Sequence, residues 1–377
     1  MASVLFLLLV GLAMLLPTES ASLRNDSFAT RASHFFWRQV VLTVVGLAML
    51  LWAACTDYRI WGRRALPLLL MTVLLLVLVL IPPIGTRHAG AYRMFDVGLV
   101  QVRPAVPARI VVILYLAYWL ARRRPGVQDS SLKGSLAAKA DSLVRNEIKL
   151  LPILPVIVVM GLIWLEPDPV TNNLIGLVVV VLLLLGGVRW RTMARLCAVA
   201  VGVILWRMWS NPFAWARLST YWRRDSLHDG ISRSPSIGEM ILSQSGWTGT
   251  GLGQGHLTQN LSPSASSDYI GAFIVEAFGR AGLLCVSLAF AAFVVAGFSV
   301  SARARDRFGL LLGAGIVTLI GVQALLHLTV VSGLLPARPV SLPFVSYGGG
   351  ELCVLLTGVG VLLSIARHAP PEGSGSP

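Results

Sequence analysis

Long apolar runs recur along the whole chain, and this feature limits the fold more than any other. A helix needs roughly 20 apolar residues to cross the ~30 Å hydrocarbon layer of a membrane. Runs of about that length predict about ten transmembrane helices, near residues 3–17, 39–56, 66–83, 107–121, 149–165, 172–188, 193–210, 269–299, 308–333 and 350–366. The predicted fold class is therefore all-α, a polytopic membrane protein.

Charged residues are scarce and mostly basic. They make up 13% of the 377 residues, about half of the fraction in a soluble protein, which excludes a soluble multidomain fold. The 31 Lys and Arg residues outnumber the 17 Asp and Glu residues and lie largely in short loops, as the positive-inside rule requires. Membrane lipids with anionic head groups are thus expected partners, and nucleic acid is not. The four cysteines have no metal-binding spacing, so no metal site is predicted.

The distribution of Lys and Arg over alternate loops predicts the orientation. The loops after the second, fourth, sixth and eighth helices carry more basic residues than the other loops. Much of the basic charge of the other loops lies in the long loop 207–268, and long loops have little influence on orientation. Both termini are therefore expected in the cytoplasm, with loop 207–268, between helices 7 and 8, outside. Residues 1–368 form one predicted transmembrane domain, and residues 369–377, rich in Pro, Gly and Ser, form a predicted disordered tail.

Carboxylates near helix ends are the first candidates for chemistry, because charges are costly at membrane depth. Asp268 ends the outer loop at the start of a predicted helix, in the sequence SSDYIG. Two roles are open for it: a carboxylate that caps the helix, or a general base at the membrane surface. Glu276 lies about two turns further on and Arg280 follows it at i+4, which predicts an ion pair along the helix.

Two glycine-rich stretches interrupt the apolar pattern. The stretch GWTGTGLGQG at 246–255 either presents backbone amides to a phosphate or is a plain flexible loop; its candidate residues are Gly249, Gly251 and Gly253. In the stretch LPARPVSLPFVSYGGG at 335–350, three prolines and three glycines prevent a continuous helix, so its backbone must be buried in protein or line a cavity. Its candidate residues are Ser346, Tyr347, Gly348 and Gly349.

The second stretch resembles the signature of a known family. GLLPARPVSLPFVSYGGGEL is similar to GLLPxTGIPLPFxSYGGSS of the SEDS family (shape, elongation, division and sporulation; RodA, FtsW and SpoVE). The glycine stretch and SDYIGAFIVEAFGRAG look like the family's GxGxG loop and TDFIFAxxAEELGxxG segment. FWRQ at 36–39, GAYR at 90–93, RPAVPAR at 103–109 and EPDPVT at 166–171 look like its RQ, GAxRW, QPSELAK and QPDLGT motifs. The order agrees over about residues 10–368.

The resemblance implies a ten-helix glycosyltransferase of the bacterial inner membrane that polymerises the glycan strand of peptidoglycan. Its implied substrate is lipid II on an undecaprenyl carrier, and its implied partner is a class B penicillin-binding transpeptidase. The types that act in elongation, division and sporulation share these motifs.

The implied mechanism is inverting and uses Asp268, at the position of the family's essential aspartate, as the base. It removes the proton of the GlcNAc C4 hydroxyl of one lipid II, which attacks C1 of MurNAc on the growing chain, and undecaprenyl pyrophosphate leaves. Arg93 and Arg109 match basic family positions that suit the pyrophosphate, and Glu276 matches the first glutamate of AEELG. A divalent cation, Mg²⁺ or Mn²⁺, is an optional helper.

The chain also departs from the family pattern. Val106 stands where QPSELAK has its glutamate, and Ala277 stands where AEELG has its second glutamate. Two other functions stay open, and the departures from the motifs favour the second of them. One is a transporter or flippase for lipid-linked precursors, because many helices with buried polar groups also suit transport. The other is a scaffold of low activity that positions the transpeptidase.

Overall fold

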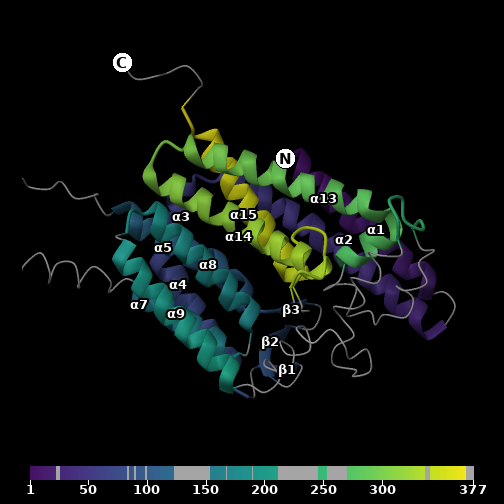
Figure 1. Ribbon diagram of the computed structural model, residues 1–377, viewed down its shortest axis with the longest axis horizontal. Coiled ribbons are helices and arrows are strands. Elements are labelled where there is room, and N and C mark those ends of the chain that lie inside the picture. Colours follow the sequence, from purple (N-terminus) through teal and green to yellow (C-terminus); the bar gives the residue numbers. More distant parts are fainter. Residues whose placement is uncertain are drawn as a thin grey trace, which may run out of the picture. The chain divides into compact units, whose positions relative to one another are not determined.

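The computed structural model describes residues 1–22, 26–82, 85–88, 91–97, 100–122, 153–166, 168–188, 190–210, 245–252, 270–335 and 340–370. This part of the chain is mostly helical (Figure 1), which confirms the main feature of the predicted fold class. The helices are α1 (Ala2–Ser22), α2 (Asp26–Cys55), α3 (Tyr58–Arg63), α4 (Ala65–Leu80), α5 (Ala105–Arg122), α7 (Leu154–Leu165), α8 (Pro169–Leu185), α9 (Trp190–Ser210), α13 (Ile270–Ala302), α14 (Arg307–Val331) and α15 (Gly349–Arg367).

Each predicted apolar run overlaps one of these helices. Within the described residues, five helices are long and apolar enough to cross a membrane: Phe36–Cys55, Ala105–Arg122, Ile270–Ala302, Arg307–Val331 and Gly349–Arg367. Shorter apolar helices span Ala2–Leu15, Ala65–Leu80, Leu154–Leu165 and Pro169–Leu185. Leu66 and Leu70 of α4 are 53% and 62% exposed, so this helix turns an apolar face outward, as a helix in contact with lipid does.

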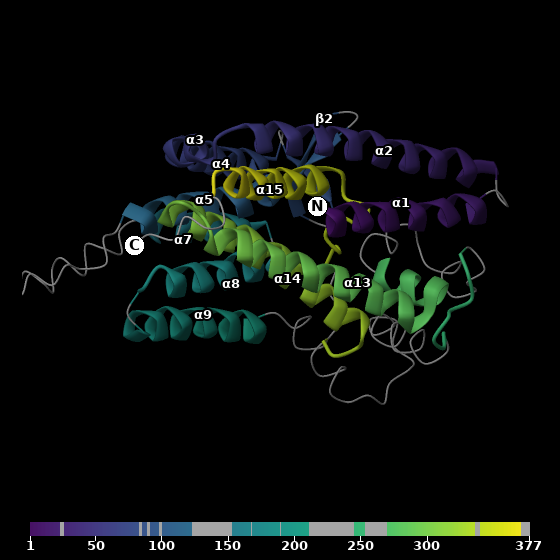
Figure 2. The same ribbon diagram turned by 90° about the horizontal axis from the view of Figure 1, so that it is seen from above.

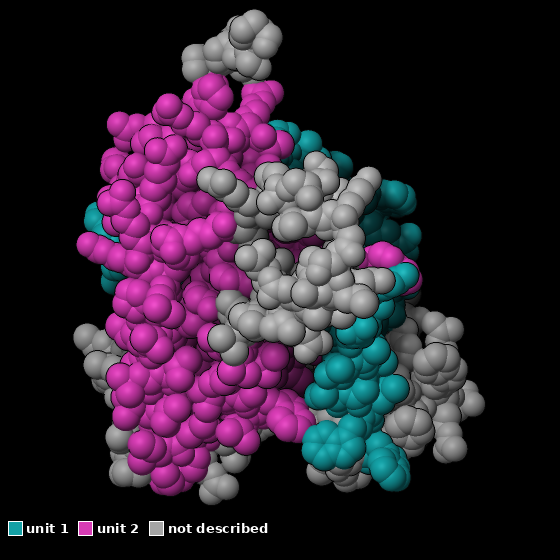
Figure 3. Space-filling model, turned by 90° about the vertical axis from the view of Figure 1, so that its left-hand side faces the viewer, with its two compact units in different colours: residues 1–52, 191–299, 317–360 teal, residues 53–190, 300–316, 361–377 magenta. Residues whose placement is uncertain are grey.

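The chain divides into two compact units, coloured separately in Figure 3. Each unit combines segments that are far apart in the sequence, so neither is a continuous stretch of chain. The single domain over residues 1–368 stays a prediction. Unit 1 comprises residues 1–52, 191–299 and 317–360, and unit 2 comprises residues 53–190, 300–316 and 361–377.

Unit 2 is built around α5. This helix packs against α4 and α8, and α7 packs against α4 and α8 (Figures 1 and 2). The fully buried side chains of α5 include Ile113, Leu116 and Leu120. The side chains of Arg109 and Thr171, each in the first turns of its helix, are bonded, so α5 and α8 start at the same end of the unit.

A small antiparallel sheet lies at this end of unit 2 and is absent from the predicted all-α fold. Strand β2 (Ala91–Val97) pairs with β1 (Thr86–His88) and with β3 (Val100–Val102), and β2 packs against α4. The strands are too short to appear in a search for long apolar runs. One sequence pattern could have predicted these strands. A glycine, Gly90 or Gly98, lies in each short connection between segments that contain β-branched and aromatic residues.

Unit 1 gathers the first two helices and the two glycine-rich stretches. Helix α1 touches the loop 340–348, because a Cβ on Gly11 would lie 2.8 Å from the Val345 carbonyl oxygen. Helix α2 touches α15, where Cys353 Sγ lies 3.5 Å from the Leu42 carbonyl oxygen. The loop 340–348 also reaches α13 through Phe344, whose ring meets Phe293 edge-on. The loop is therefore buried within protein, as the sequence predicted.

Candidate functional site

Helix α13 is interrupted at Gly279, whose backbone angles (φ 67°, ψ −164°) are not helical. The interruption separates a short helix, residues 270–278, from the longer helix 280–302. Glu276 and Arg280 therefore stand on different sides of it. The predicted ion pair assumed the i,i+4 spacing of a continuous helix. The helix is not continuous here, and the pair itself stays a prediction.

The glycine loop, residues 245–252, holds the C-terminal end of the short helix. Thr250 N–H donates to the Glu276 carbonyl at 2.8 Å, and Gly251 N–H donates to the Ala277 carbonyl at 3.0 Å. These are carbonyls that a helix leaves unpaired at its end. The two amides are thus bonded inside the chain. The contact of Gly249 and Gly251 with substrate stays a prediction.

Two glycines make this contact feasible. A Cβ on Gly249 (φ 73°) would lie 2.5 Å from the Gly279 nitrogen, and a Cβ on Gly279 would lie 2.3 Å from the Trp247 oxygen. Both backbones also have φ in the left-handed region that favours glycine. The glycine loop and the interruption in α13 therefore require one another.

The N-terminal end of the short helix is held by His327 of α14. Gly271 N–H donates to His327 Nε2 at 3.2 Å, and His327 Nδ1 lies 2.6 Å from the Val340 carbonyl oxygen. Because Nε2 accepts, the ring proton sits on Nδ1 and bonds that carbonyl. His327 is 1% exposed and was not identified from the sequence. It joins the short helix to the second glycine-rich stretch.

Asp268 and Gly253 lie outside the described residues, so their roles stay predictions. The described chain resumes at Ile270, two residues after Asp268. The first-turn amide of Gly271 is already bonded to His327, and a capping carboxylate would compete with the imidazole for this donor.

The SYGG sequence forms the turn that leads into α15. Its Ser346 is buried and its hydroxyl oxygen accepts from Leu342 N–H at 2.7 Å. The charged Arg38 side chain of α2 lies close to the Tyr347 side chain. The turn ends at Gly348 and Gly349, and the Gly348 carbonyl accepts from an amide of the first turn of α15. The four predicted residues therefore lie together, and their contact with substrate stays a prediction.

A carboxylate in the first turn of α15 locks this turn. Glu351 accepts from the Ser341 hydroxyl at 2.7 Å and from the Gln323 amide at 2.8 Å. Beside Ser341 and Glu351 the chain leaves a cavity of about 10 Å³, which has room for about one water molecule. A space of this size does not admit a sugar ring, so the network serves to fix the turn.

A second polar cluster lies in unit 2, where the sheet meets the starts of α5 and α8. Arg93 Nε donates to the Glu166 carbonyl at 2.7 Å. Arg109 donates to the Thr171 hydroxyl at 2.7 Å, and this hydroxyl donates to Asp168 Oδ2 at 2.7 Å. The structure thus brings the two predicted basic residues into one cluster with two carboxyl groups, both missed as site residues. We call these five residues the arginine–acid cluster.

Glu166 in this cluster has an unusual proton affinity. Burial, and next the charge of Asp168, raise the pKa of its carboxyl group to about 8, although Arg93 acts in the opposite direction. The pKa of such a carboxyl group is higher in the folded than in the unfolded state. The free energy of unfolding therefore falls as the pH rises from the pKa of the unfolded state to the pKa of the folded state.

We therefore expect the Tm of the wild-type protein to fall between pH 6 and pH 9 more than that of Glu166→Gln, whose amide does not titrate. Thermal unfolding in detergent, followed at both pH values, measures this difference. Parallel curves for the two proteins would show that Glu166 does not titrate in this range.

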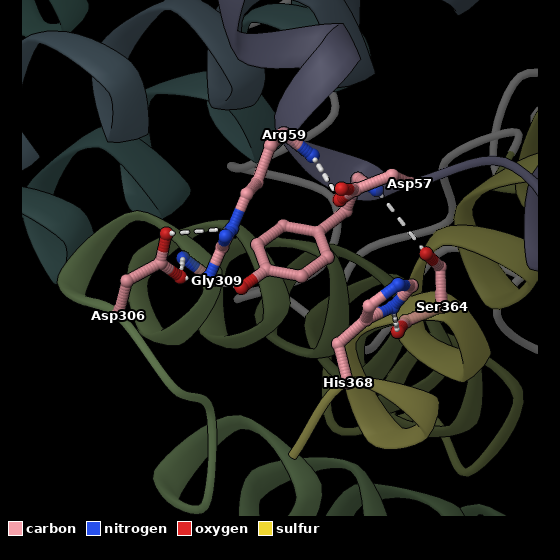
Figure 4. Close-up of polar contacts among 7 residues, drawn as sticks. Asp57, Arg59, Asp306, Gly309, Ser364 and His368 are labelled. Atoms are coloured by element: carbon pink, nitrogen blue, oxygen red, sulfur yellow. Dashed lines mark hydrogen bonds and ion pairs between the residues drawn. The ribbon is translucent and has the colours of Figure 1, made fainter.

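The opposite end of unit 2 holds a third polar cluster, shown in Figure 4. The buried Tyr58 donates its hydroxyl to Asp306 Oδ1 at 2.6 Å, and Arg59 Nε lies 3.6 Å from Asp306 Oδ2. Asp306 Oδ1 also accepts Gly309 N–H, and the Ser364 hydroxyl oxygen accepts Tyr58 N–H. These bonds join α3 to the start of α14 and to the end of α15, and we assign the cluster a structural role.

Tyr58→Phe is expected to lower the free energy of unfolding by about 1–2 kcal/mol, because a hydrogen bond to a charged group is lost in a buried site. Tyr118→Phe is the matched control, since the Tyr118 ring packs edge-on against Phe308 and its hydroxyl forms no hydrogen bond within the described residues. Thermal unfolding in detergent compares the two. Equal Tm values would show that the bond to Asp306 contributes nothing.

Across the described residues, no three His, Cys, Asp or Glu side chains gather as a metal site. The pair Glu166 and Asp168 lies beside Arg93 and Arg109, whose charges repel a cation. These carboxyl groups therefore do not fit a divalent metal ion, and no step below depends on one.

The apolar helices, with polar clusters near their ends, define a multi-pass membrane protein. The sequence signature of the FtsW, RodA and SpoVE family, described as "Cell cycle protein", matches residues 1–370. The chain belongs to this family, which confirms the resemblance.

Curated relatives and solved structures match over nearly the whole chain. The proteins named "Probable peptidoglycan glycosyltransferase FtsW" from Geobacter sulfurreducens (strain DL-1 / KN400) and Bacillus subtilis (strain 168) are 31% and 28% identical to it. These matches cover 91% and 95% of the chain, and 89% and 88% of the relatives.

The Rod shape determining protein RodA of Thermus thermophilus has the same fold, with a TM-score of 0.64 at 22% identity over 98% of this chain and 97% of that one. A chain of the structure described as "Structural coordination of polymerization and crosslinking by a peptidoglycan synthase complex" has a TM-score of 0.72 at 23% identity, and covers 97% of each chain.

Proposed function

We propose that this chain is a peptidoglycan glycosyltransferase that polymerises lipid II in cell elongation or division. The observation that carries the proposal is the alignment of about nine tenths of the chain with relatives of that name, in the same family. The short helix 270–278 follows Asp268 and is bonded at one end to His327 and at the other to the glycine loop. This supports the proposal, because a general base must be fixed relative to its substrate.

In the proposed reaction, Asp268 accepts the proton of the GlcNAc C4 hydroxyl of one lipid II. The oxygen forms a bond to C1 of MurNAc on the growing chain, and the bond from C1 to the phosphate oxygen breaks. Its electron pair leaves with undecaprenyl pyrophosphate, so the configuration at C1 inverts. Arg93 and Arg109 stabilise the negative charge of the leaving group.

The proposed topology has ten transmembrane helices in the inner membrane, with both termini in the cytoplasm and loop 207–268 outside. It follows from the positive-inside rule. Fusion of a reporter that fluoresces only in the cytoplasm, at residue 377 and separately within loop 207–268, tests it. Fluorescence from the loop fusion would contradict the topology and the location of Asp268 with it.

The proposed partner is a class B penicillin-binding transpeptidase, which crosslinks the strands that this chain makes. The structural match to a complex described as coordinating polymerization and crosslinking supports this pairing.

A polymerisation assay tests the function. The purified protein, with and without a transpeptidase of its source organism, receives labelled lipid II, and products are sized on a gel, with Mg²⁺, with Mn²⁺ and with chelator. Glu372→Gln, beyond the residues that match the family, is the control and should polymerise like the wild type. Movement of lipid II across vesicles without polymer would establish a transporter instead. Partner binding with neither activity would establish a scaffold.

A further inference from the structure

Glu166 carries a buried carboxyl group that the proposed mechanism leaves without a role. The residue follows α7 and is 1% exposed. Its main chain is bonded on both sides, because its N–H donates to the Leu162 carbonyl at 3.3 Å and its carbonyl accepts from Arg93. Its Oε1, in contrast, is buried with no hydrogen-bond partner in the part of the chain that the structure describes.

The neighbouring polar side chains have hydrogen bonds of their own. Asp168 accepts the Thr171 N–H at 3.1 Å with Oδ1 and the Thr171 hydroxyl at 2.7 Å with Oδ2. Arg109 donates to the same hydroxyl. Arg93 donates its Nε–H to the main-chain carbonyl of Glu166.

The arrangement favours a neutral carboxyl group at Glu166. A buried carboxylate oxygen that receives no hydrogen bond is costly, as the Oε1 of an ionised Glu166 would be, and the raised pKa of Glu166 agrees with this geometry. With Glu166 neutral, the arginine–acid cluster holds two guanidinium groups against the one carboxylate of Asp168. The cluster then has a net positive charge, which suits an anion, and the acid O–H is a donor in need of an acceptor.

We propose that Glu166, as a neutral acid, donates a hydrogen bond to a phosphate group of the lipid-linked substrate, which Arg93 and Arg109 also hold. The proposal rests on the proposed function, from which it takes the substrate. A phosphate oxygen supplies the missing acceptor and the negative charge together, and guanidinium groups are well suited to phosphate. An apolar site that keeps a carboxylic acid neutral so that it can donate has precedent in enzymes. The proton stays on Glu166 throughout.

Binding without turnover tests this role. Asp268→Ala protein in phosphatidylcholine vesicles is titrated with undecaprenyl pyrophosphate at pH 7 and pH 9. The Kd is expected to rise about tenfold with pH, because the neutral fraction of an acid with a pKa near 8 falls by about that factor. The double variant Asp268→Ala, Glu166→Gln should keep the affinity at pH 7 and lose most of the rise of the Kd with pH, since the amide donates at both pH values. Addition of Glu166→Leu should weaken binding about tenfold at pH 7.

The contrary outcomes are distinct. The same rise with pH in the Glu166→Gln background would overturn the proposal, as would full affinity in Glu166→Leu protein with an unchanged Tm. A pH effect that appears only in phosphatidylglycerol vesicles would assign the site to a phospholipid head group and overturn the assignment to substrate. Because no turnover is measured, a wild-type protein that makes no polymer would count against the proposed function alone.

Discussion

Asp268→Asn is expected to lower the rate of lipid II polymerisation by about 10²–10⁴-fold, the contribution of a general base. Asparagine keeps the size and much of the hydrogen bonding of aspartate but does not accept a proton. An asparagine is also as good as an aspartate at a helix N-cap. The substitution therefore separates the two roles of Asp268, because a residue that only caps the helix would tolerate it.

The rate is measured with labelled lipid II in the presence of the transpeptidase, and the Tm is measured in parallel. An unchanged Tm with a lost rate supports the base, whereas a normal rate would remove Asp268 from the chemistry. The bond from Gly271 N–H to His327 makes the first result the expected one. That amide has an acceptor already, so the fold depends less on the Asp268 side chain.

The sequence predicted most of the helices, because all of them except the six-residue α3 overlap a long apolar run. A run of this kind needs no information from distant residues, since its length and hydropathy alone favour the membrane. The interruption at Gly279 is different. A glycine inside an apolar run is common in transmembrane helices, and the contact that fixes its left-handed φ comes from residues about 30 positions away, at Trp247 and Gly249. No local pattern records such a contact.

The same distinction applies to the site residues. Arg93 and Arg109 were identified through short motifs, but their common cluster depends on bonds to Glu166 and Thr171, which lie 73 and 62 positions further along the chain. Glu166 appeared in the sequence only as the first residue of EPDPVT and not as a site residue, because its burial and its unsatisfied oxygen are properties of the packed structure. His327 lies within the predicted helix 308–333 and was not identified for the same reason. Chemistry that depends on desolvation is visible only after folding.

Gly279→Ala is expected to lower the polymerisation rate by about 100-fold, because it forces the short helix away from the glycine loop. The new Cβ would lie 2.3 Å from the Trp247 oxygen and 2.4 Å from the Trp247 carbonyl carbon, and neither backbone atom can rotate away. The backbone angles at Gly279 are also nearly exclusive to glycine and cost a residue with a Cβ about 1–3 kcal/mol. The short helix follows Asp268 directly, and a shift of about 1 Å at a catalytic group can cost 10²-fold in rate.

Gly202→Ala is the matched control, because nothing lies within 4 Å of its added Cβ. If Gly279→Ala does not fold, Thr250→Val tests the same contact more gently: it removes only the 3.0 Å bond from the Thr250 hydroxyl to the Glu276 carbonyl, and should lower the rate by less. Rates equal to that of Gly202→Ala in both variants would show that the glycine loop does not position the residue that does the chemistry.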